Sequence, residues 1–387
     1  MQFDFYMPAK VLFGPGRLNE LAAAKLPGRK ALIVTGGTSI KKFGYLDRVI
    51  DLLKQNNCES VVFDKILPNP IKSHVMEGAA IAKSTYCDFV VGLGGGSSMD
   101  SAKSIAVMAK NPGDYWDYVS GGTGKGLPVL NGALPIICIT TTAGTGTESD
   151  PWTVVTKEDT NEKIGFGNQY TFPTLSIVDP ELMKTVPPDL TAYQGFDALF
   201  HSTEGFIANI ANPMSDIFAE KSIDLLFRNL PAAVKDGNNI DARNFVAMAN
   251  TFSGVVESTS SCTSSHSIAH AISALYPKIP HGFALIAISV PYYRLFTEKI
   301  PDRIAELGKI ATFGKSDNFV TALQNLKTSC NVGGITLSQF GVKEDMAKAI
   351  AENAFDTMGG LFNLDRYKLS MNEVVDIVTC SINGDNY

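Results

Sequence analysis

Four of the five histidines of this 387-residue chain fall in its C-terminal half. The segment GFDALFHSTEGF places Asp197 and His201 four residues apart, and HSIAH places His266 and His270 at the same spacing. On a helix, residues at i and i+4 share one face and lie about 6 Å apart along the axis. His281 follows a proline that stops a helix, so its side chain can point back toward the same centre. One carboxylate with several imidazoles indicates a site for a divalent metal ion.

The residues around these histidines narrow the chemistry of the metal. The segment HSIAH lacks the glutamate of HExxH, so a hydrolytic zinc site would have no general base. Three neutral imidazoles and one carboxylate leave a divalent ion with net positive charge, and such an ion can polarise a substrate oxygen as a Lewis acid. Spacing alone does not tell which histidine stays off the metal. His74 lies in the other half of the chain and is expected at the surface.

A glycine-rich turn in GLGGGSSMD, residues 92–100, lies between an apolar strand and a helix. Glycine lets the backbone approach a phosphate, and the first amides of the next helix carry partial positive charge. Gly92 and Gly94 fit the first two positions of GxGxxG, but Ser97 occupies the third, so the ordinary dinucleotide fingerprint is not met. The strand–turn–helix context still favours phosphate binding over a purely structural turn.

Two further segments bear on the cofactor. The turn after the first strand lacks the acidic residue that holds the ribose 2′-hydroxyl of NAD, and its small, hydroxyl and cationic groups suit a 2′-phosphate, which predicts NADP. Asp64, at the end of the second strand, is a competing ribose partner that would favour NAD. The threonine-rich run TTTAGTGTESD offers hydroxyls and amides to a nicotinamide or a pyrophosphate. The groups of the first turn are Gly36, Gly37, Thr38, Ser39, Lys41 and Lys42.

The elements that must position these residues divide the chain in two. From residue 30 to about 179, continuous apolar strands alternate with helical segments, which predicts a parallel sheet covered on both faces, with the nucleotide at the carboxyl ends of its strands. From residue 191 onward nearly every segment has helical period. We therefore expect an α/β dinucleotide-binding domain over 1–186 and an all-helical metal- and substrate-binding domain over 187–387.

Composition excludes several other classes. The net charge of −6 without a long basic run gives no reason to expect a nucleic-acid partner. The six cysteines are scattered without a CxxC pair, which favours free thiols in a reducing cytosol. The first residues lack the pattern of a signal peptide, and no apolar stretch is long enough for a membrane span. The expected localisation is cytoplasmic, with no membrane partner.

The order of these motifs resembles that of the iron-containing alcohol dehydrogenases (group III). The resemblance runs from VLFGPG through GGTSIKK, PNP, GGGSSMDSAK, TTTAGTGTE and GFDALFH to HSIAH…PHG and covers essentially the whole chain. It implies a Rossmann-like half followed by a helical half, as in dehydroquinate synthase. It also implies hydride transfer between NAD(P)H and a small aldehyde or primary alcohol, Fe²⁺ with Zn²⁺ as an alternative, and a homodimer or larger assembly.

The resemblance also implies roles for individual residues. The metal ligands would be Asp197, His201, His266 and His281, which leaves His270 as an uncoordinated proton relay. NAD-preferring relatives often carry an Asp in the first turn, so this chain resembles the NADP-preferring butanol dehydrogenase and aldehyde reductase branch. The segment VESTSSCTSS before His266 departs from the family, being richer in small polar residues than the usual glycine-rich approach. Further cofactor contacts would come from Asn69, Gly95, Gly96, Ser97, Asp100, Thr141, Thr142, Thr145 and Lys163.

Three alternatives remain open at the level of sequence. A glycerol or polyol dehydrogenase of the same superfamily would use zinc and NAD with vicinal diols. A dehydroquinate synthase-like lyase would need several basic residues for a phosphorylated sugar acid, and none cluster beside the histidines. A protein that only binds metal or nucleotide would not need both an intact ligand set and an intact cofactor set.

Overall fold

A computed structural model describes residues 2–384 of the chain and divides it into two compact units. One unit comprises Met7–Thr185, and the other contains the chain from Val186 onward together with the N-terminal segment up to Tyr6. The short segment joins the second unit because the ring of Phe5 stacks on Phe218 at a centroid distance of 6.2 Å. That the first unit binds a dinucleotide and the second binds metal and substrate stays a prediction.

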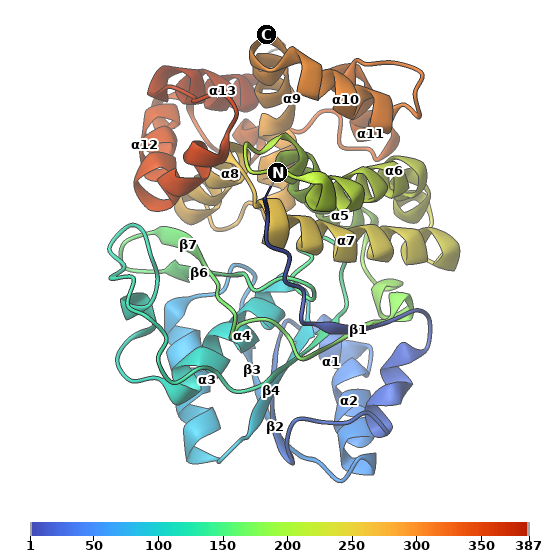
Figure 1. The fold of residues 1–387 in the computed structure, drawn as a ribbon, viewed down its shortest axis with the longest axis vertical. Helices are drawn as coiled ribbons and strands as arrows, with labels where there is room; N and C mark the ends of the chain where they lie inside the picture. Colours follow the sequence, from blue (N-terminus) through green and yellow to red (C-terminus); the bar gives the residue numbers. More distant parts are fainter. Residues whose placement is uncertain (1, 385–387) are drawn as a thin grey trace. The chain divides into compact units, whose positions relative to one another are not determined.

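The first unit is built on a six-stranded parallel sheet with the order β1-β8-β5-β4-β2-β3. Figure 1 labels β1, β2, β3 and β4 of this sheet. Its inner strands are continuous buried apolar runs, as expected where helices cover both faces. The predicted parallel sheet is confirmed, and β1 lies at one edge of it. The strands are β1 Lys10–Phe13, β2 Lys30–Gly36, β3 Glu59–Ile66, β4 Phe89–Gly94, β5 Ile136–Thr140 and β8 Leu175–Val178.

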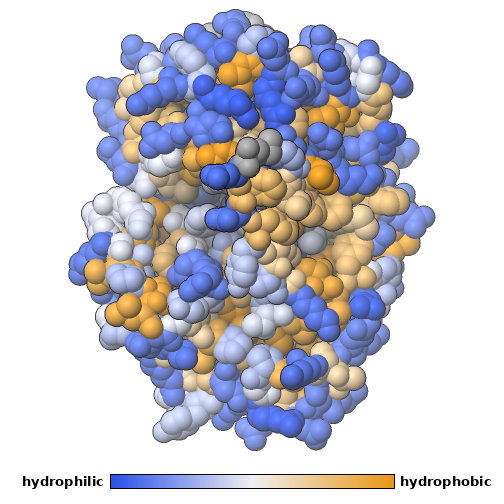
Figure 2. Space-filling model, viewed as in Figure 1, coloured by the Kyte–Doolittle hydropathy of each residue, from blue (hydrophilic) through white to orange (hydrophobic). Residues whose placement is uncertain are grey.

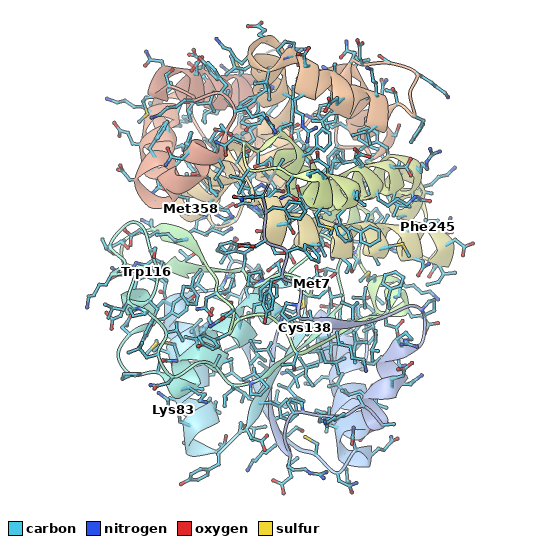
Figure 3. The ribbon with its side chains drawn as sticks, in the orientation of Figure 1. Met7, Lys83, Trp116, Cys138, Phe245 and Met358 are labelled. Atoms are coloured by element: carbon cyan, nitrogen blue, oxygen red, sulfur yellow. The ribbon has the colours of Figure 1, made fainter. Side chains whose placement is uncertain are left out.

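The remaining elements of this unit pack on the sheet or extend from it. An antiparallel hairpin of β6 Thr153–Lys157 and β7 Glu162–Phe166 was not predicted, because its two short strands do not show a long apolar run. Cys138, labelled in Figure 3, is fully buried in the middle of β5. The helices are α1 Ser39–Lys42, α2 Tyr45–Gln55, α3 Lys72–Ser84 and α4 Gly96–Lys110, with 3₁₀ turns η1 Arg17–Ala22, η2 Tyr115–Asp117 and η3 Pro180–Met183.

In the part of the second unit that the structure describes, every regular element is helical, as predicted. Prolines begin α5, α6 and α10, because a proline at the first helical position has no N–H to leave unbonded. The helices are α5 Pro188–Ile207, α6 Pro213–Lys235, α7 Ile240–Ser260, α8 Ser264–Leu275, α9 His281–Lys299, α10 Pro301–Ala311, α11 Phe319–Ser329, α12 Ala347–Met358 and α13 Met371–Asn383, with 3₁₀ turns η4 Leu337–Phe340, η5 Glu344–Met346 and η6 Gly359–Leu364.

The hydropathy of the surface and of the helices can be compared with what a membrane-spanning helix requires. Figure 2 shows hydrophilic residues predominating over the outer helices of the helical unit on the face in view. Along residues 2–384, no helix combines the length and the apolar character needed to cross a bilayer. Within residues 2–384 none of the six cysteines forms a disulfide, as the sequence predicted.

Candidate metal centre and cofactor loops

Three helices of the helical unit bring the predicted metal ligands together. Helix α5 carries Asp197 and His201, α8 carries His266, and α9 begins at His281 directly after Pro280. The first three of these side chains are almost completely buried, and that of His281 is 20% exposed. Each ligand therefore comes from a regular helix or from its first residue, which is a rigid way to hold a site.

The distances suit a metal ion shared by Asp197, His266 and His281, whose ligand atoms all lie within 4.8 Å of one another. His201 falls in a second set of this kind, with Cys262 and His266. Asp197 Oδ1 lies 3.6 Å from His266 Nε2, 3.6 Å from His281 Nε2 and 4.0 Å from His201 Nε2. Two ligand atoms placed tetrahedrally around an ion at 2.1 Å lie about 3.4 Å apart. Asp197 Oδ1 and His266 Nε2 are buried and make no hydrogen bond, although buried polar atoms are normally paired. A cation between these atoms would satisfy both, so the donor set fits a metal.

A close approach of two helix backbones places His281 beside Asp197. A Cβ atom added at Gly282 would lie 2.0 Å from the carbonyl oxygen of Tyr193. Only glycine permits this contact between the first turn of α9 and the second turn of α5. The glycine of the PHG motif is therefore needed for packing.

His270, predicted as the uncoordinated histidine, adjoins the group on a different side. Its ring centroid lies 4.9 Å from that of His281 and 6.2 Å from that of His266. Its Nδ1 lies 2.7 Å from Sδ of Met358, the last residue of α12, which is labelled in Figure 3. His270 is 6% exposed and belongs to neither set of side chains close enough to share an ion. The structure thus places His270 next to the cluster, and its role as an uncoordinated proton relay stays a prediction.

Glu204 is a residue of this site that sequence reasoning missed. It is fully buried, and its carboxylate accepts hydrogen bonds from the backbone N–H of Thr263 at 2.9 Å and of His266 at 3.2 Å. Its Oε1 lies 2.7 Å from His266 Nδ1, which leaves Nε2 of the same ring facing Asp197. A carboxylate behind a ligating histidine fixes the ring and its tautomer. The available signal was its spacing, because Glu204 falls three and seven residues after His201 and Asp197, on one helical face.

The surroundings of His266 favour positive charge at its ring. Burial disfavours the imidazolium, but the nearby Cys262 and the Glu204 carboxylate outweigh burial and raise the pKa of His266 well above its usual value. Glu257 adds a further carboxylate, since its Oε2 lies 3.7 Å from His201 Nε2. The carboxylates of Asp197, Glu204 and Glu257 around these rings would stabilise a bound metal cation as they stabilise a proton.

The carboxylate of Glu204 is expected to raise metal affinity through its contact with His266. Replacing Glu204 by Gln removes the charge behind His266 and weakens the control of its tautomer. We expect metal affinity to fall about 10- to 100-fold, as for other outer partners of metal ligands. Titration with Co²⁺ or Zn²⁺ measures this, with Glu298→Gln at the exposed far end of α9 as the matched control. Unchanged affinity in Glu204→Gln would show that this carboxylate only stabilises the fold.

In the α/β unit, the glycine-rich turn packs directly against the threonine-rich loop. Added Cβ atoms at Gly95 and Gly96 would lie 3.0 Å from Thr142 Oγ1 and 2.4 Å from Thr145 Cγ2. The backbone N–H of Thr141 also donates to Gly94 O at 2.9 Å. The structure therefore brings these two predicted cofactor segments together where α4 begins.

A buried lysine anchors the same loop. Lys103 on α4 is fully buried, and its Nζ lies 3.0 Å from Asp150 Oδ1 and donates to Asp150 O at 2.9 Å and Trp152 O at 2.7 Å. Asp150 outweighs burial and raises the pKa of Lys103. Asp100 accepts from Thr147 Oγ1 at 2.9 Å and from the backbone N–H of Val154 at 3.0 Å. Both oxygens of Asp100 thus bond within the protein, and its contact with a cofactor stays a prediction.

Lys41, which was predicted to favour NADP, and Asp64, which would favour NAD, form an ion pair with each other. Lys41 Nζ donates to Asp64 Oδ2, and this bond lowers the pKa of the carboxyl. The turn from Gly37 to Ser39 is exposed. Lys163 and Asn69, two further predicted contacts, are also joined, with Lys163 Nζ 2.8 Å from Asn69 Oδ1.

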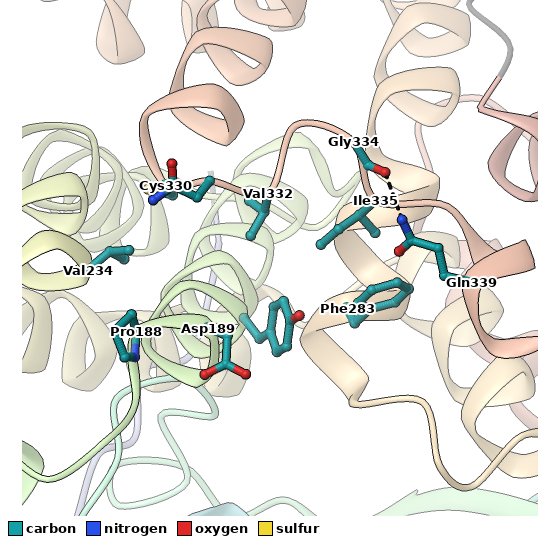
Figure 4. Close-up of a pocket in the computed structure, with 11 residues that line it drawn as sticks. Pro188, Asp189, Val234, Phe283, Cys330, Val332, Gly334, Ile335 and Gln339 are labelled. Atoms are coloured by element: carbon teal, nitrogen blue, oxygen red, sulfur yellow. Dashed lines mark hydrogen bonds between the residues drawn. The ribbon is translucent and has the colours of Figure 1, made fainter.

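A separate cavity of about 500 Å³ lies within the helical unit (Figure 4). Asp189 is the charged residue of its lining, and Tyr193 and Phe283 pack edge to face across a centroid distance of 5.7 Å. None of the histidines lines it, so this cavity is distinct from the metal cluster. The lining comprises Pro188, Asp189, Tyr193, Val234, Phe283, Cys330, Asn331, Val332, Gly334, Ile335 and Gln339.

Comparison with known proteins agrees with this combination of fold and site. Residues 8–180 match the family model described as iron-containing alcohol dehydrogenase, and residues 191–381 match the C-terminal model of the Fe-containing alcohol dehydrogenase family. The chain belongs to the iron-containing alcohol dehydrogenase family, and its class of activity is that of an alcohol dehydrogenase.

Individual relatives cover nearly the whole chain. A NAD-dependent methanol dehydrogenase of Bacillus methanolicus is 32% identical, over 91% of this chain and 93% of its own length. An NADPH-dependent butanol dehydrogenase of Clostridium saccharobutylicum is 31% identical, over 89% of this chain and 88% of its own. The crystal structure of an archaeal alcohol dehydrogenase from a Red Sea brine pool superposes with a TM-score of 0.94 at 36% identity, over 99% of both chains. Relatives that differ in cofactor are thus almost equally similar, so likeness alone does not decide between NAD and NADP.

Proposed function

We propose that this protein is a metal-dependent dehydrogenase that interconverts small aldehydes and primary alcohols with NADP(H). The observation that carries the proposal is the buried group of Asp197 and three histidines, in which Asp197 Oδ1 and His266 Nε2 make no hydrogen bond. Ferrous iron is the metal expected from the family, although zinc usually binds a given site of nitrogen and oxygen ligands more tightly. Bound metal supplies Lewis acidity, and a bound nicotinamide cofactor supplies or accepts hydride.

The residues of the helical unit have separate roles in this proposal. Asp197, His201, His266 and His281 hold the metal, and Glu204 orients His266 through Nδ1. His270 exchanges a proton with the substrate oxygen, directly or through water. We assign this transfer to Nε2, because Nδ1 contacts Met358 Sδ. Burial of the whole group keeps the electrostatic interactions of these residues strong.

The residues of the α/β unit bind the cofactor in this proposal. The amides at the start of α4, with the hydroxyl of Ser97, hold the pyrophosphate at a helix N-terminus. The neighbouring loop with Thr141, Thr142 and Thr145 lies against the same turn and would contact the nicotinamide side. Lys163 and Asn69 are weaker candidates for contact with the nucleotide.

Preference for NADP rests on the first turn. A 2′-phosphate would draw Lys41 from its partner Asp64 and accept from the hydroxyls of Thr38 and Ser39, whereas NAD would use Asp64 for its ribose. Gly37 leaves room for the phosphate, whereas Gly36 packs tightly against the carbonyl oxygen of Ile66. We expect the ion pair with Asp64 to moderate the preference, so that NAD is accepted less well but not rejected.

A panel of aldehydes assayed with NADPH and NADH on metal-analysed protein tests the proposed function. The expected result is oxidation of NADPH with butyraldehyde and other short aldehydes, with a higher kcat/KM for NADPH than for NADH. Activity confined to NAD with vicinal diols would replace the proposal by a polyol dehydrogenase. Absence of turnover with every aldehyde and alcohol in metal-loaded protein would overturn it.

A further inference from the structure

The thiol of Cys262 lies at the edge of the metal cluster, where no role was assigned to it. Its Sγ and one ring nitrogen each of His201 and His266 all lie within 4.8 Å of one another. The side chain of Cys262 is 4% exposed, so the thiol faces the interior. His266 Nε2 is buried without a hydrogen-bond partner. A soft donor thus stands within reach of a buried imidazole that has one unsatisfied ring nitrogen.

The backbone before Cys262 takes an unusual conformation that sets its position. Helix α7 ends at Ser260, and α8 begins at Ser264. Between them Ser261 has a φ of 65°, a left-handed conformation that is uncommon for any residue except glycine. Such conformations cost free energy and concentrate at functional sites, where surrounding structure maintains them. This turn falls in the segment whose small polar residues depart from the family's glycine-rich pattern.

We propose that Cys262 is an additional metal ligand, which with His201 and His266 forms a second donor set for a thiophilic ion such as Zn²⁺. This proposal rests on the proposed metal centre and extends it. The set of Asp197, His266 and His281 offers one oxygen and two nitrogen donors, whereas the second set adds sulfur. Both sets include His266.

The chemistry of the sulfur predicts metal selectivity. Thiolate ligands favour zinc and other soft ions, whereas carboxylates suit harder ones. When the bond between Sγ and the metal forms, the thiol proton is released to solvent. Loss of the sulfur should weaken binding of Zn²⁺ about 10- to 100-fold, at least as much as loss of an outer partner does, and should leave Fe²⁺ binding much less affected.

X-ray absorption at the zinc edge of zinc-loaded protein tests this directly. A sulfur ligand lies about 2.3 Å from zinc, clearly beyond nitrogen and oxygen ligands at about 2.0–2.2 Å. We expect one sulfur in the natural protein and in Cys330→Ser, a buried cysteine of the same unit, and none in Cys262→Ser. Cys262→Ala serves as a second variant, and circular dichroism establishes that each protein is folded.

Two results would overturn the role of Cys262. One is a zinc shell of nitrogen and oxygen alone in the natural protein, and the other is a sulfur signal that persists in both Cys262 variants. Either result would leave the metal centre of Asp197 and the histidines intact. Failure of the natural protein to bind any divalent ion would instead overturn that centre itself, so the two failures are distinguishable.

Discussion

Replacement of His201 by Ala is expected to abolish turnover and to lower metal affinity by more than about 100-fold, beyond what loss of an outer partner costs. His201 lies on the same face of α5 as Asp197, and its Nε2 is 4.0 Å from Asp197 Oδ1. Removal of the imidazole leaves a buried gap in the donor set. Cofactor binding should be largely spared, because the predicted nucleotide contacts all lie in the other unit. Metal analysis and fluorescence of bound NADPH measure the two effects separately.

The matched control for this variant is His74→Ala, which removes the histidine that lies outside the cluster. Metal content and activity should be unchanged in that protein. Full activity of His201→Ala without metal would contradict the proposed centre. Loss of metal in His270→Ala with retention in His201→Ala would mean that ligand and proton relay are exchanged.

Replacement of Lys103 by Met is expected to destabilise the α/β unit by about 3–5 kcal/mol, because it leaves buried carboxylates without their cation. Asp150 loses an ion pair of 3.0 Å, and the carbonyl of Trp152 loses a donor. Both tryptophans, Trp116 and Trp152, belong to this unit. Tryptophan fluorescence during urea unfolding therefore reports the stability of the α/β unit alone.

Lys110→Met is the matched control, since Lys110 is the exposed last residue of the same helix. Its unfolding midpoint should stay close to that of the natural protein. Binding of NADPH should weaken in Lys103→Met, because the threonine-rich loop loses its anchor. Equal midpoints for the two variants would show that the buried network contributes no net stability.

The fold could be predicted largely from the sequence because its signals are local. Each apolar strand and each intervening helix between residues 30 and 179 has the hydrophobic pattern of its own kind of element, and the parallel sheet follows from their alternation. The order of the strands could not be predicted, because it depends on pairing between distant segments such as β1 and β8. Pro231 and Pro291 lie inside α6 and α9, where tertiary packing keeps the helices continuous through residues that normally end them.

The candidate site could be predicted in part, because some of its residues lie on the same helix. The i,i+4 spacing of Asp197 and His201 limits their side chains to one helical face, so their proximity follows from the chain itself. Glu204 was missed because its role depends on which segment packs opposite it. Its spacing from His201 and Asp197 places it on their helical face but does not show that it bonds to His266. Cys262 was missed because a lone cysteine has no distinctive local pattern, although it lies only four residues before His266 in the chain.

Turnover by this protein should depend directly on bound metal. The measurement is the rate of NADPH oxidation with butyraldehyde by protein stripped with a chelator and then titrated with Fe²⁺ without oxygen. We expect negligible activity after stripping and recovery in proportion to bound iron, with saturation at one ion per chain. Full activity in metal-free protein, or iron that binds without restoring any turnover, would contradict the assignment of Asp197 and the histidines as a catalytic metal centre.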